Sequence, residues 1–352
     1  MRKYAVFGGF LGSGKTTTMM ALTKSYSARF GRAAMISNDL GEGVDLADDR
    51  LARLGGCSAS QITDECICFC HDVLREKLED WYAAGCELVV SDIPGFGVGA
   101  LEHVYHGLEA ECPEEYELAP FTVLTEPRNV SVLRTGGGDM AHILDAQLRE
   151  ADLIVLNKCD TLDDARAEED RAFLAARYPE AEVIALSALT GEGIEKLCLA
   201  LREGKASLRH PAIDYDDEDL QREMGSLSEY YLQYHAAVCC FDFDGNAYLS
   251  DIAEHVRGAF RARGFAIPHL KLLAWEPEGD YGKADLLGTE RPLECAHRFA
   301  RPCTELAVIL NASAACPADA LGEILDGAVE EVSALYQLER TVFRRDCFGM
   351  GE

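Results

Sequence analysis

A glycine-rich segment close to the N-terminus constrains the fold more than any other feature of the sequence. Residues 9–16 read GFLGSGKT and lie between an apolar run at residues 2–7 and a stretch at residues 17–27 with helical periodicity. Strand, glycine loop and helix in this order are typical of a P-loop, in which backbone N–H groups bind phosphate oxygens at a helix N-terminus. The segment therefore predicts a nucleoside triphosphate site in an α/β domain.

Each residue type in this loop has an expected role. The ammonium group of Lys15 would reach the β- and γ-phosphates, and the hydroxyl of Thr16 would bind Mg²⁺. The residues that we expect to contact the phosphates are Gly12, Ser13, Gly14, Lys15, Thr16 and Thr17.

Two loops downstream are candidates for sensing the γ-phosphate. An apolar run at residues 87–91 ends in Asp92 and, three residues later, Gly95. Asp92 would hold the hydration shell of Mg²⁺, and the Gly95 amide would approach the γ-phosphate. Residues 38–45 (NDLGEGVD) follow another predicted strand at residues 32–37. They fit either a loop near the phosphates, as expected at the carboxyl end of a strand, or a solvated acidic turn.

Residues 157–160 (NKCD) follow a buried apolar run and indicate guanine recognition. The Asp160 carboxylate would accept hydrogen bonds from N1–H and the exocyclic amine of guanine, which adenine does not present there. We expect Asn157 and Lys158 to act with it, and the loop at residues 187–193 (SALTGEG) to back the base through Ser187, Ala188 and Leu189. The expected ligand is GTP or GDP with Mg²⁺.

Three thiols alternate at Cys66, Cys68 and Cys70, with Glu65 and His71 beside them. Thiolates bind Zn²⁺, Cu(I) or iron, and imidazole or carboxylate can complete such a site. An extended segment would place all three sulfurs on one face, whereas a helix would bring only Cys66 and Cys70 together. Free cysteines are also common as small buried apolar residues. The density of the cluster favours metal or redox chemistry.

Composition limits the partners. The net charge of −28 argues against nucleic acid and anionic membranes, because their phosphates would be repelled. The sequence has no apolar run of membrane-spanning length and no charged-then-apolar leader, so we expect its first residue to be the mature start. Fourteen cysteines without a leader predict a cytoplasmic protein with reduced thiols.

The length of 352 residues predicts two domains. We expect a P-loop GTPase domain with a mostly parallel sheet at residues 1–205, an acidic helical connector at 206–235, and a smaller α/β domain at 236–352. The last domain reads as strand 236–243, helix 248–263, strand 270–275, strand 305–311, helix 317–338 and strand 341–347. This β-α-β-β-α-β order predicts a ferredoxin-like sandwich.

The order of these motifs resembles that of the CobW/HypB/UreG group of P-loop GTPases, which includes metallochaperones and metalloenzyme-assembly factors. The resemblance covers roughly residues 1–205 and rests on the P-loop, the acidic loop with Asp39 and Glu42, the cysteine segment, and the two loops at Asp92 and Asn157. It implies binding of Zn²⁺, Co²⁺ or Fe²⁺ through Cys66 and Cys68, with Asp39 and Glu42 nearby. Phe69 stands where these proteins carry a third thiol, and Cys70 follows it; Asp39 and Asp92 replace the usual glutamates.

We therefore predict a GTP-hydrolysing metallochaperone or assembly factor for a metal- or corrinoid-dependent client enzyme. Lys15, Asp39 and Asp92 are the candidate catalytic residues, and Cys66, Cys68, Cys70, Asp39 and Glu42 are the candidate transition-metal ligands. A homodimer is expected from the resemblance alone. The alternative is a regulatory GTPase that activates such a client without carrying metal. A kinase is disfavoured, because it would not need a guanine-reading loop.

Overall fold

The computed structural model describes residues 2–42, 46–112, 114–136, 140–208, 210, 212–277 and 279–351. The chain divides into two compact units, one formed by Met1–Leu40 with Ala52–Glu223 and the other by Gly41–Leu51 with Met224–Glu352. Each unit is described separately below. Residues 43–45 of the predicted acidic loop lie outside the described residues.

The first unit is built on a parallel sheet with the order β3-β2-β4-β1-β6-β7-β8, in which the short β5 also pairs with β1. Its strands are β1 (Lys3–Gly9), β2 (Ala33–Asn38), β3 (Ala59–Ile62), β4 (Leu88–Asp92), β5 (Glu117–Leu118), β6 (Thr122–Thr125), β7 (Leu153–Leu156) and β8 (Glu182–Ala185). The strands β1, β2, β4, β6 and β7 are buried along their whole length, as their continuous apolar runs predict for a sheet covered on both faces.

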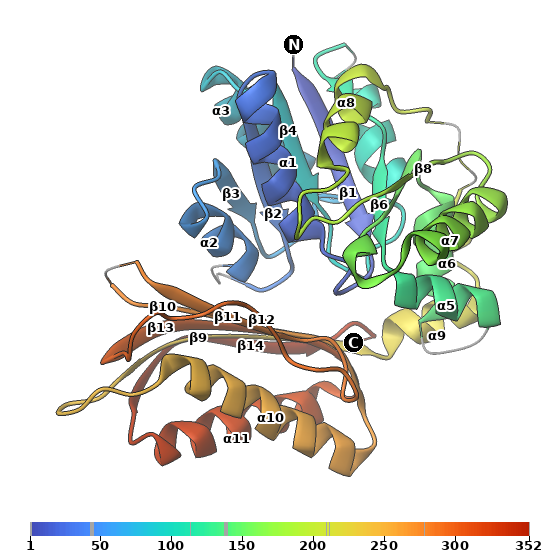
Figure 1. Ribbon diagram of the computed structural model, residues 1–352. Helices are drawn as coiled ribbons and strands as arrows, with labels where there is room; N and C mark the ends of the chain where they lie inside the picture. Colours follow the sequence, from blue (N-terminus) through green and yellow to red (C-terminus); the bar gives the residue numbers. More distant parts are fainter. Residues whose placement is uncertain are drawn as a thin grey trace. The chain divides into compact units, whose positions relative to one another are not determined.

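Helices surround this sheet (Figure 1). They are α1 (Lys15–Arg29), α3 (His71–Ala83), the π-helix η1 (Leu101–His106), α4 (Gly107–Glu111), α5 (Pro127–Thr135), α6 (Ala141–Arg149), the 3₁₀ turn η2 (Cys159–Thr161), α7 (Asp164–Arg177) and α8 (Ile194–Glu203). Two further helices, α2 (Ala47–Leu54) and α9 (Glu218–Gly225), cross the boundary between the units. The apolar faces of α1 and α8 share one core with the sheet through residues such as Met19, Leu22 and Leu197.

All strands of this sheet point the same way, so their carboxyl ends meet at one edge. The predicted P-loop follows β1, Asp92 ends β4, and the Asn157 and Ser187 loops follow β7 and β8. Ligands of open α/β sheets bind at this edge. The fold therefore places most of the predicted site in one region.

The second unit is an antiparallel sheet with the order β12-β11-β10-β13-β9-β14. Helices α10 and α11 pack on one face of it (Figure 1). The elements are β9 (Leu227–Ala237), α10 (Gly245–Arg263), β10 (Ala266–Trp275), β11 (Tyr281–Leu286), β12 (Glu294–His297), β13 (Glu305–Ala315), α11 (Ala318–Leu335) and β14 (Glu339–Gly349). The order β10-β13-β9-β14 is that of a ferredoxin-like sandwich, and β11 and β12 extend its edge.

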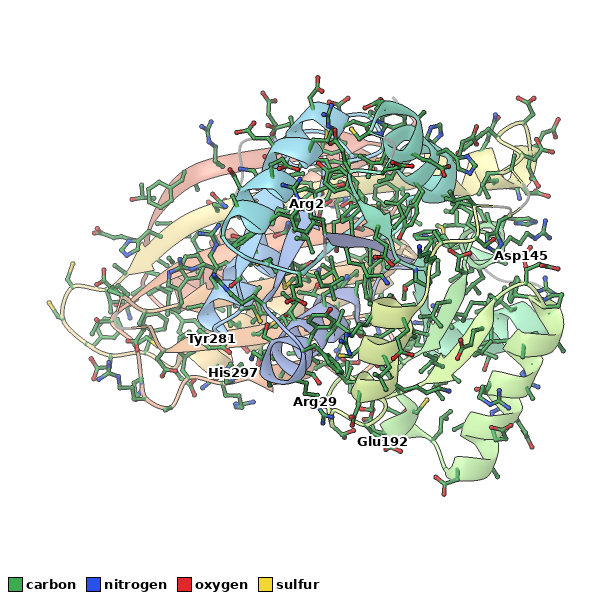
Figure 2. The ribbon with its side chains drawn as sticks, turned by 90° about the horizontal axis from the view of Figure 1, so that it is seen from above. Arg2, Arg29, Asp145, Glu192, Tyr281 and His297 are labelled. Atoms are coloured by element: carbon green, nitrogen blue, oxygen red, sulfur yellow. The ribbon has the colours of Figure 1, made fainter. Side chains whose placement is uncertain are left out.

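Strands β11 and β12 were absent from the sequence-based prediction, and their pairing involves side chains as well as the backbone. Tyr281 on β11 and His297 on β12 make an edge-to-face ring contact with centroids 3.9 Å apart (Figure 2).

Among the described helices of the whole chain, none is long and apolar enough to cross a membrane.

The predicted start of the C-terminal domain at residue 236 is wrong. Residues 227–234 were assigned to the helical connector, but they form most of β9, whose side chains alternate across the sheet. Tyr230, Leu232 and Tyr234 project into the core formed with the helices. The acidic residues that precede this strand led to a predicted domain boundary that lies too far along the chain. Aromatic and branched residues at every second position nevertheless favour a strand. The predicted strand at 236–243 ends at Ala237.

The segment Gly41–Leu51 also differs from the prediction, which placed it in the first domain. It packs on the sheet of the second unit, where Leu46 contacts Tyr231 and Phe348. Asp48 and Lys271 form an ion pair with an O–N distance of 2.6 Å, and the Arg50 guanidinium lies 4.4 Å from the centroid of the Trp275 ring. The chain thus inserts a short piece of its N-terminal half into the C-terminal unit.

The strand assignment of β9 is testable by a pair of leucine truncations. Leu232 is 3% exposed inside the core, whereas Leu335 at the end of α11 is 68% exposed. We expect Leu232→Ala to lower the free energy of unfolding by about 2–5 kcal/mol, because it removes buried methyl groups and leaves a cavity. Leu335→Ala should change it by under about 0.5 kcal/mol. Urea denaturation measures both, and similar small effects would contradict the assignment.

Candidate functional site

The loop after β1 has the geometry of a phosphate-binding loop. Gly12 and Gly14 have φ values of 78° and 94°, which side chains with a Cβ rarely adopt. Helix α1 starts at Lys15, directly after this left-handed turn, and the Lys15 ammonium donates a hydrogen bond to the Gly9 carbonyl at 2.7 Å. The lysine side chain therefore folds back along the loop that it follows.

The N-terminus of α1 is well suited to an anion. It has no side-chain capping hydrogen bond and no acidic residue in its first turn, so the helix dipole is not offset there. The Ser13 hydroxyl is buried and has no hydrogen-bond partner among the described residues. Thr16 is buried and Thr17 is exposed in the first turn. The backbone N–H groups of a helix N-terminus and this buried hydroxyl fit the phosphates of a nucleotide.

The loop after β4 lies against the P-loop. Asp92 is 5% exposed and pairs in register with Phe7 of β1, and its Oδ1 atom accepts the Asn38 N–H at 2.9 Å. A Cβ atom placed on Gly95 would lie 2.5 Å from Leu11 Cδ2 and 3.1 Å from Leu11 N. A side chain at position 95 would force Leu11 to move. The carboxylate of Asp92 and the hydroxyl of Thr16 are oxygen donors of the kind that Mg²⁺ prefers.

The Asn157 side chain joins the two loops predicted for the base to the P-loop. Its Nδ2 atom donates to the Ser13 carbonyl at 2.9 Å, and its Oδ1 atom accepts the Ala188 N–H at 3.0 Å. Asn157 is 2% exposed, so both contacts are sheltered from water. Because it contacts both neighbours, this one amide fixes the spacing between the predicted phosphate and base sites.

The rest of the predicted base site is open to a ligand. Asp160 is exposed in η2, and Leu189 is 76% exposed. The loop that carries Leu189 is closed by a hydrogen bond from the Ser187 N–H to the Glu192 carbonyl at 3.0 Å, and Glu192 is labelled in Figure 2. Lys158 adopts a φ of 62° and forms an ion pair with the buried Glu126 at 2.8 Å.

The cysteine segment is a turn, neither extended nor helical. The Phe69 N–H donates to the Cys66 carbonyl at 2.8 Å, and α3 begins immediately after Cys70. Neither alternative from the sequence therefore describes the arrangement of the sulfurs. Cys68 is buried, Cys66 and Cys70 are half-buried, and Phe69 is exposed.

Asn38, at the end of β2, holds this turn from inside the first unit. Its Nδ2 atom donates to the carbonyls of Ile62 at 3.2 Å and Glu65 at 2.9 Å, and its Oδ1 atom accepts the Ile67 N–H at 3.0 Å. Its own N–H donates to Asp92. The cysteine turn and the carboxylate predicted for Mg²⁺ thus share one buried asparagine.

The three thiols differ in acidity. The Cys66 pKa is lowered, mainly because the Cys68 thiol donates to its sulfur, while the same contact and burial raise the pKa of Cys68. Burial raises the pKa of Cys70 to about 11. Cys66 is therefore the first of the three to become a thiolate, the form that binds metals.

The candidate transition-metal ligands are not preassembled. Among the residues that the structure describes, no group of three or more histidine, cysteine, aspartate or glutamate side chains is arranged to hold a metal ion. His71 pairs with Glu111 at 3.0 Å, and Glu42 falls in the second unit, where its N–H donates to Asp346 at 3.3 Å. Asp39 is half-buried after β2. The metal assignment of Cys66, Cys68, Cys70, Asp39 and Glu42 stays a prediction.

Four residues of the region escaped the sequence analysis as functional candidates: Asn38, Glu126, Gln147 and Glu150. All four are nearly fully buried polar side chains. Glu126 has one local signal, since it precedes Pro127 directly after a strand. The contacts of the other three reach residues far away in the sequence, which no local pattern reveals.

Glu150 makes the stability of the first unit depend on pH. Burial raises its pKa to about 7, opposed by hydrogen bonds from the N–H groups of Gly99 and Leu101; Glu102 raises the value further and His210 lowers it. The ionisable groups of Tyr215 and Cys68 also interact with this carboxylate.

Because the folded pKa lies above the ordinary value of 4.5 for a glutamate, the folded protein binds this proton more tightly than the unfolded chain. We expect its contribution to be complete below pH 4.5 and to be lost as the pH rises to about 7, by about 1.4 kcal/mol per pH unit. Urea titrations from pH 5 to 8 measure this slope. Glu150→Gln should flatten it, and an unchanged slope in that variant would refute the assignment.

The chain is similar to the hydrogenase maturation factor HypB from Archaeoglobus fulgidus, with 22% identity over 57% of this chain and 88% of that chain and a TM-score of 0.38. It is similar to the Zn(II)-bound YjiA GTPase from E. coli, with 15% identity over 95% of this chain and 98% of that chain and a TM-score of 0.39. It is also similar to HypB from Helicobacter pylori in complex with nickel, with 19% identity over 58% of this chain and 89% of that chain and a TM-score of 0.40.

A sequence model for the family described as CobW/HypB/UreG, nucleotide-binding domain, matches residues 3–185. This range contains the P-loop, the Asp92 and Asn157 loops and the cysteine turn. It covers more than half of the chain. The protein therefore belongs to the CobW/HypB/UreG family through its nucleotide-binding domain.

Proposed function

We propose that this chain binds Mg²⁺·GTP and hydrolyses it to GDP and phosphate, and that it couples this cycle to delivery of a metal or corrinoid cofactor to a client enzyme. The observation that carries the nucleotide part is the bridge of Asn157 between the Ser13 carbonyl and the Ala188 N–H. It sets a phosphate-binding loop and a guanine-reading loop at a fixed spacing, which a site for phosphate alone would not need.

Hydrolysis by this arrangement is a matter of positioning and electrostatics. The amides of the loop and the Lys15 ammonium stabilise the negative charge that spreads over the γ-phosphoryl oxygens in the transition state. Thr16 and Asp92 would hold Mg²⁺, which supplies further neutralisation of phosphate charge when bound. Asp39 and Glu42 are candidates for orienting the attacking water.

Guanine selection falls to Asp160, whose carboxylate is exposed and free to meet a base. A carboxylate accepts from the two adjacent N–H donors of guanine, and adenine would leave it without them. The exposed side chain of Leu189 is placed to cover the base.

Replacement of Asp160 by asparagine tests the guanine assignment. Asparagine can donate to the C2 carbonyl of xanthine but cannot accept from both N–H groups of guanine. We expect Asp160→Asn to weaken GDP binding roughly tenfold to a hundredfold and to strengthen binding of xanthosine diphosphate. Competition against a fluorescent nucleotide measures both, with Asp164→Asn on α7 as a matched surface control. Equal loss of both nucleotides would contradict the assigned role.

The cargo is proposed to bind at the cysteine turn. Cys66 is poised to ionise first, and Asn38 ties the turn to the end of β2 and to Asp92. A change at Asp92 on nucleotide exchange would therefore alter the turn, and by linkage a bound metal would alter nucleotide affinity equally.

Anaerobic titration with Zn²⁺, Co²⁺ and Fe²⁺ tests the cargo. We expect replacement of Cys66, Cys68 and Cys70 by serine to weaken metal binding roughly a hundredfold or more, since serine does not supply a thiolate. Replacement of the exposed Cys239 and Cys240 by serine is the control and should leave binding unchanged. Wild-type affinity should differ between GDP and a GTP analogue.

Equal binding by the wild type and the triple variant would favour the second candidate, a regulatory GTPase without metal. Under that function the three cysteines would be structural or redox-sensing residues. Under that function the triple serine variant would still activate the client.

A further inference from the structure

The loop that follows Asp92 is hydrogen-bonded to one helix along its whole length. Gln147 Nε2 on α6 donates to the carbonyls of Gly95 at 3.1 Å and Gly97 at 2.9 Å. Glu150, directly after α6, accepts the N–H groups of Gly99 at 2.6 Å and Leu101 at 3.2 Å. We refer to residues 95–101 as the glycine segment.

These contacts are buried, so the glycine segment cannot move cheaply without α6. Gln147 is 3% and Glu150 is 2% exposed. A buried donor or acceptor that loses its partner costs about 1–3 kcal/mol. Any displacement of Gly95 toward a γ-phosphate would therefore either break these hydrogen bonds or pull on the carboxyl end of α6.

The opposite end of α6 is held by the connector. The Glu223 carboxylate on α9 accepts the N–H groups of His142 at 2.9 Å and Ile143 at 3.0 Å. It also pairs with the His142 ring at 2.7 Å. An acidic side chain here satisfies unpaired N–H groups and interacts favourably with the helix dipole. Glu223 is the last residue of the first unit, shortly before β9 begins at Leu227.

Between these two ends, α6 is packed as a stiff element. Its apolar side chains Ile143, Leu144 and Leu148 are buried. Asp145, labelled in Figure 2, accepts hydrogen bonds from the Arg177 guanidinium at 2.9 Å and the Tyr178 hydroxyl at 2.7 Å. A short, well-packed helix moves as one rigid body, so a shift at one of its ends also displaces the other.

We propose that α6 couples the glycine segment to the connector helix α9, with Gln147 and Glu223 as the positioning residues at its two ends. The proposal rests on the proposed function, since it assigns the route by which the state of a bound GTP reaches the point where the chain enters β9. Coupling of this kind is reciprocal. A change in the hydrogen bonds between Glu223 and the start of α6 therefore alters the preference of the protein for GTP over GDP.

The test measures the affinities of the full-length protein for GDP and for a non-hydrolysable GTP analogue with Mg²⁺. We expect Glu223→Gln, which weakens the cap on His142 and Ile143, to change the ratio of the two affinities roughly threefold or more. Gln147→Met keeps the size of the side chain and removes both donated hydrogen bonds. In the Gln147→Met background, Glu223→Gln should have a smaller effect, because two of the four hydrogen bonds that join the glycine segment to Gln147 and Glu150 are already lost.

Glu218→Gln on the exposed side of α9 is the matched control and should leave the ratio unchanged. Thermal unfolding of each variant establishes that it is folded. An unchanged ratio in Glu223→Gln, or the same effect of that substitution in both backgrounds, would overturn the coupling while nucleotide binding stands. A wild-type protein that binds neither nucleotide would instead overturn the proposed function, and this proposal with it.

Hydrogen exchange gives an independent readout that a general loss of stability would not mimic. Exchange of the glycine segment and of residues 218–226 should both differ between the two nucleotide states in the wild type. In Glu223→Gln the difference should persist in the glycine segment and shrink in residues 218–226. A difference of full size at residues 218–226 would count against α6 as the route.

Discussion

The buried amide of Asn157 is the contact on which the nucleotide site depends. It pairs with the Ser13 carbonyl in one direction and with the Ala188 N–H in the other. The packing is so close that a Cβ atom on Gly14 would lie 2.3 Å from Asn157 Nδ2. Glycine at position 14 is thus required twice, for its left-handed backbone and for room beside this amide. The loops predicted for the phosphates and for the base are therefore held together by this one side chain.

Asn38 repeats this solution on the other side of β1. Its side chain uses both its donor and its acceptor on the backbone around the cysteine turn, and its N–H reaches Asp92. A buried side-chain amide whose donor and acceptor are both hydrogen-bonded fixes the positions of the loops it contacts. Any other arrangement of those loops would leave a polar group buried without a hydrogen-bond partner. The two asparagines lie at the carboxyl ends of β2 and β7. They place the predicted nucleotide site and the cysteine turn at the same edge of one sheet.

Local patterns in the sequence were enough to predict the parallel sheet, the P-loop and the Asp92 and Asn157 loops, since each is a run of a few residues whose spacing carries the information. The start of β9 at Leu227 was misplaced because acidic residues obscured the alternation of Tyr230, Leu232 and Tyr234. The roles of Asn38 and Gln147 depend on partners 24–29 and 50–52 residues away. Only the folded topology brings these groups together, so their function was not predictable.

The chain passes between its two units at residues 40–41, 51–52 and 223–224. The first passage directly follows Asp39 and the end of β2, and the segment that it delivers is anchored on the second unit by Leu46, Asp48 and Arg50. The third lies at Glu223, the cap of α6. The first connection thus follows a loop predicted to lie near the γ-phosphate, and the third starts on α9 at the residue that caps α6.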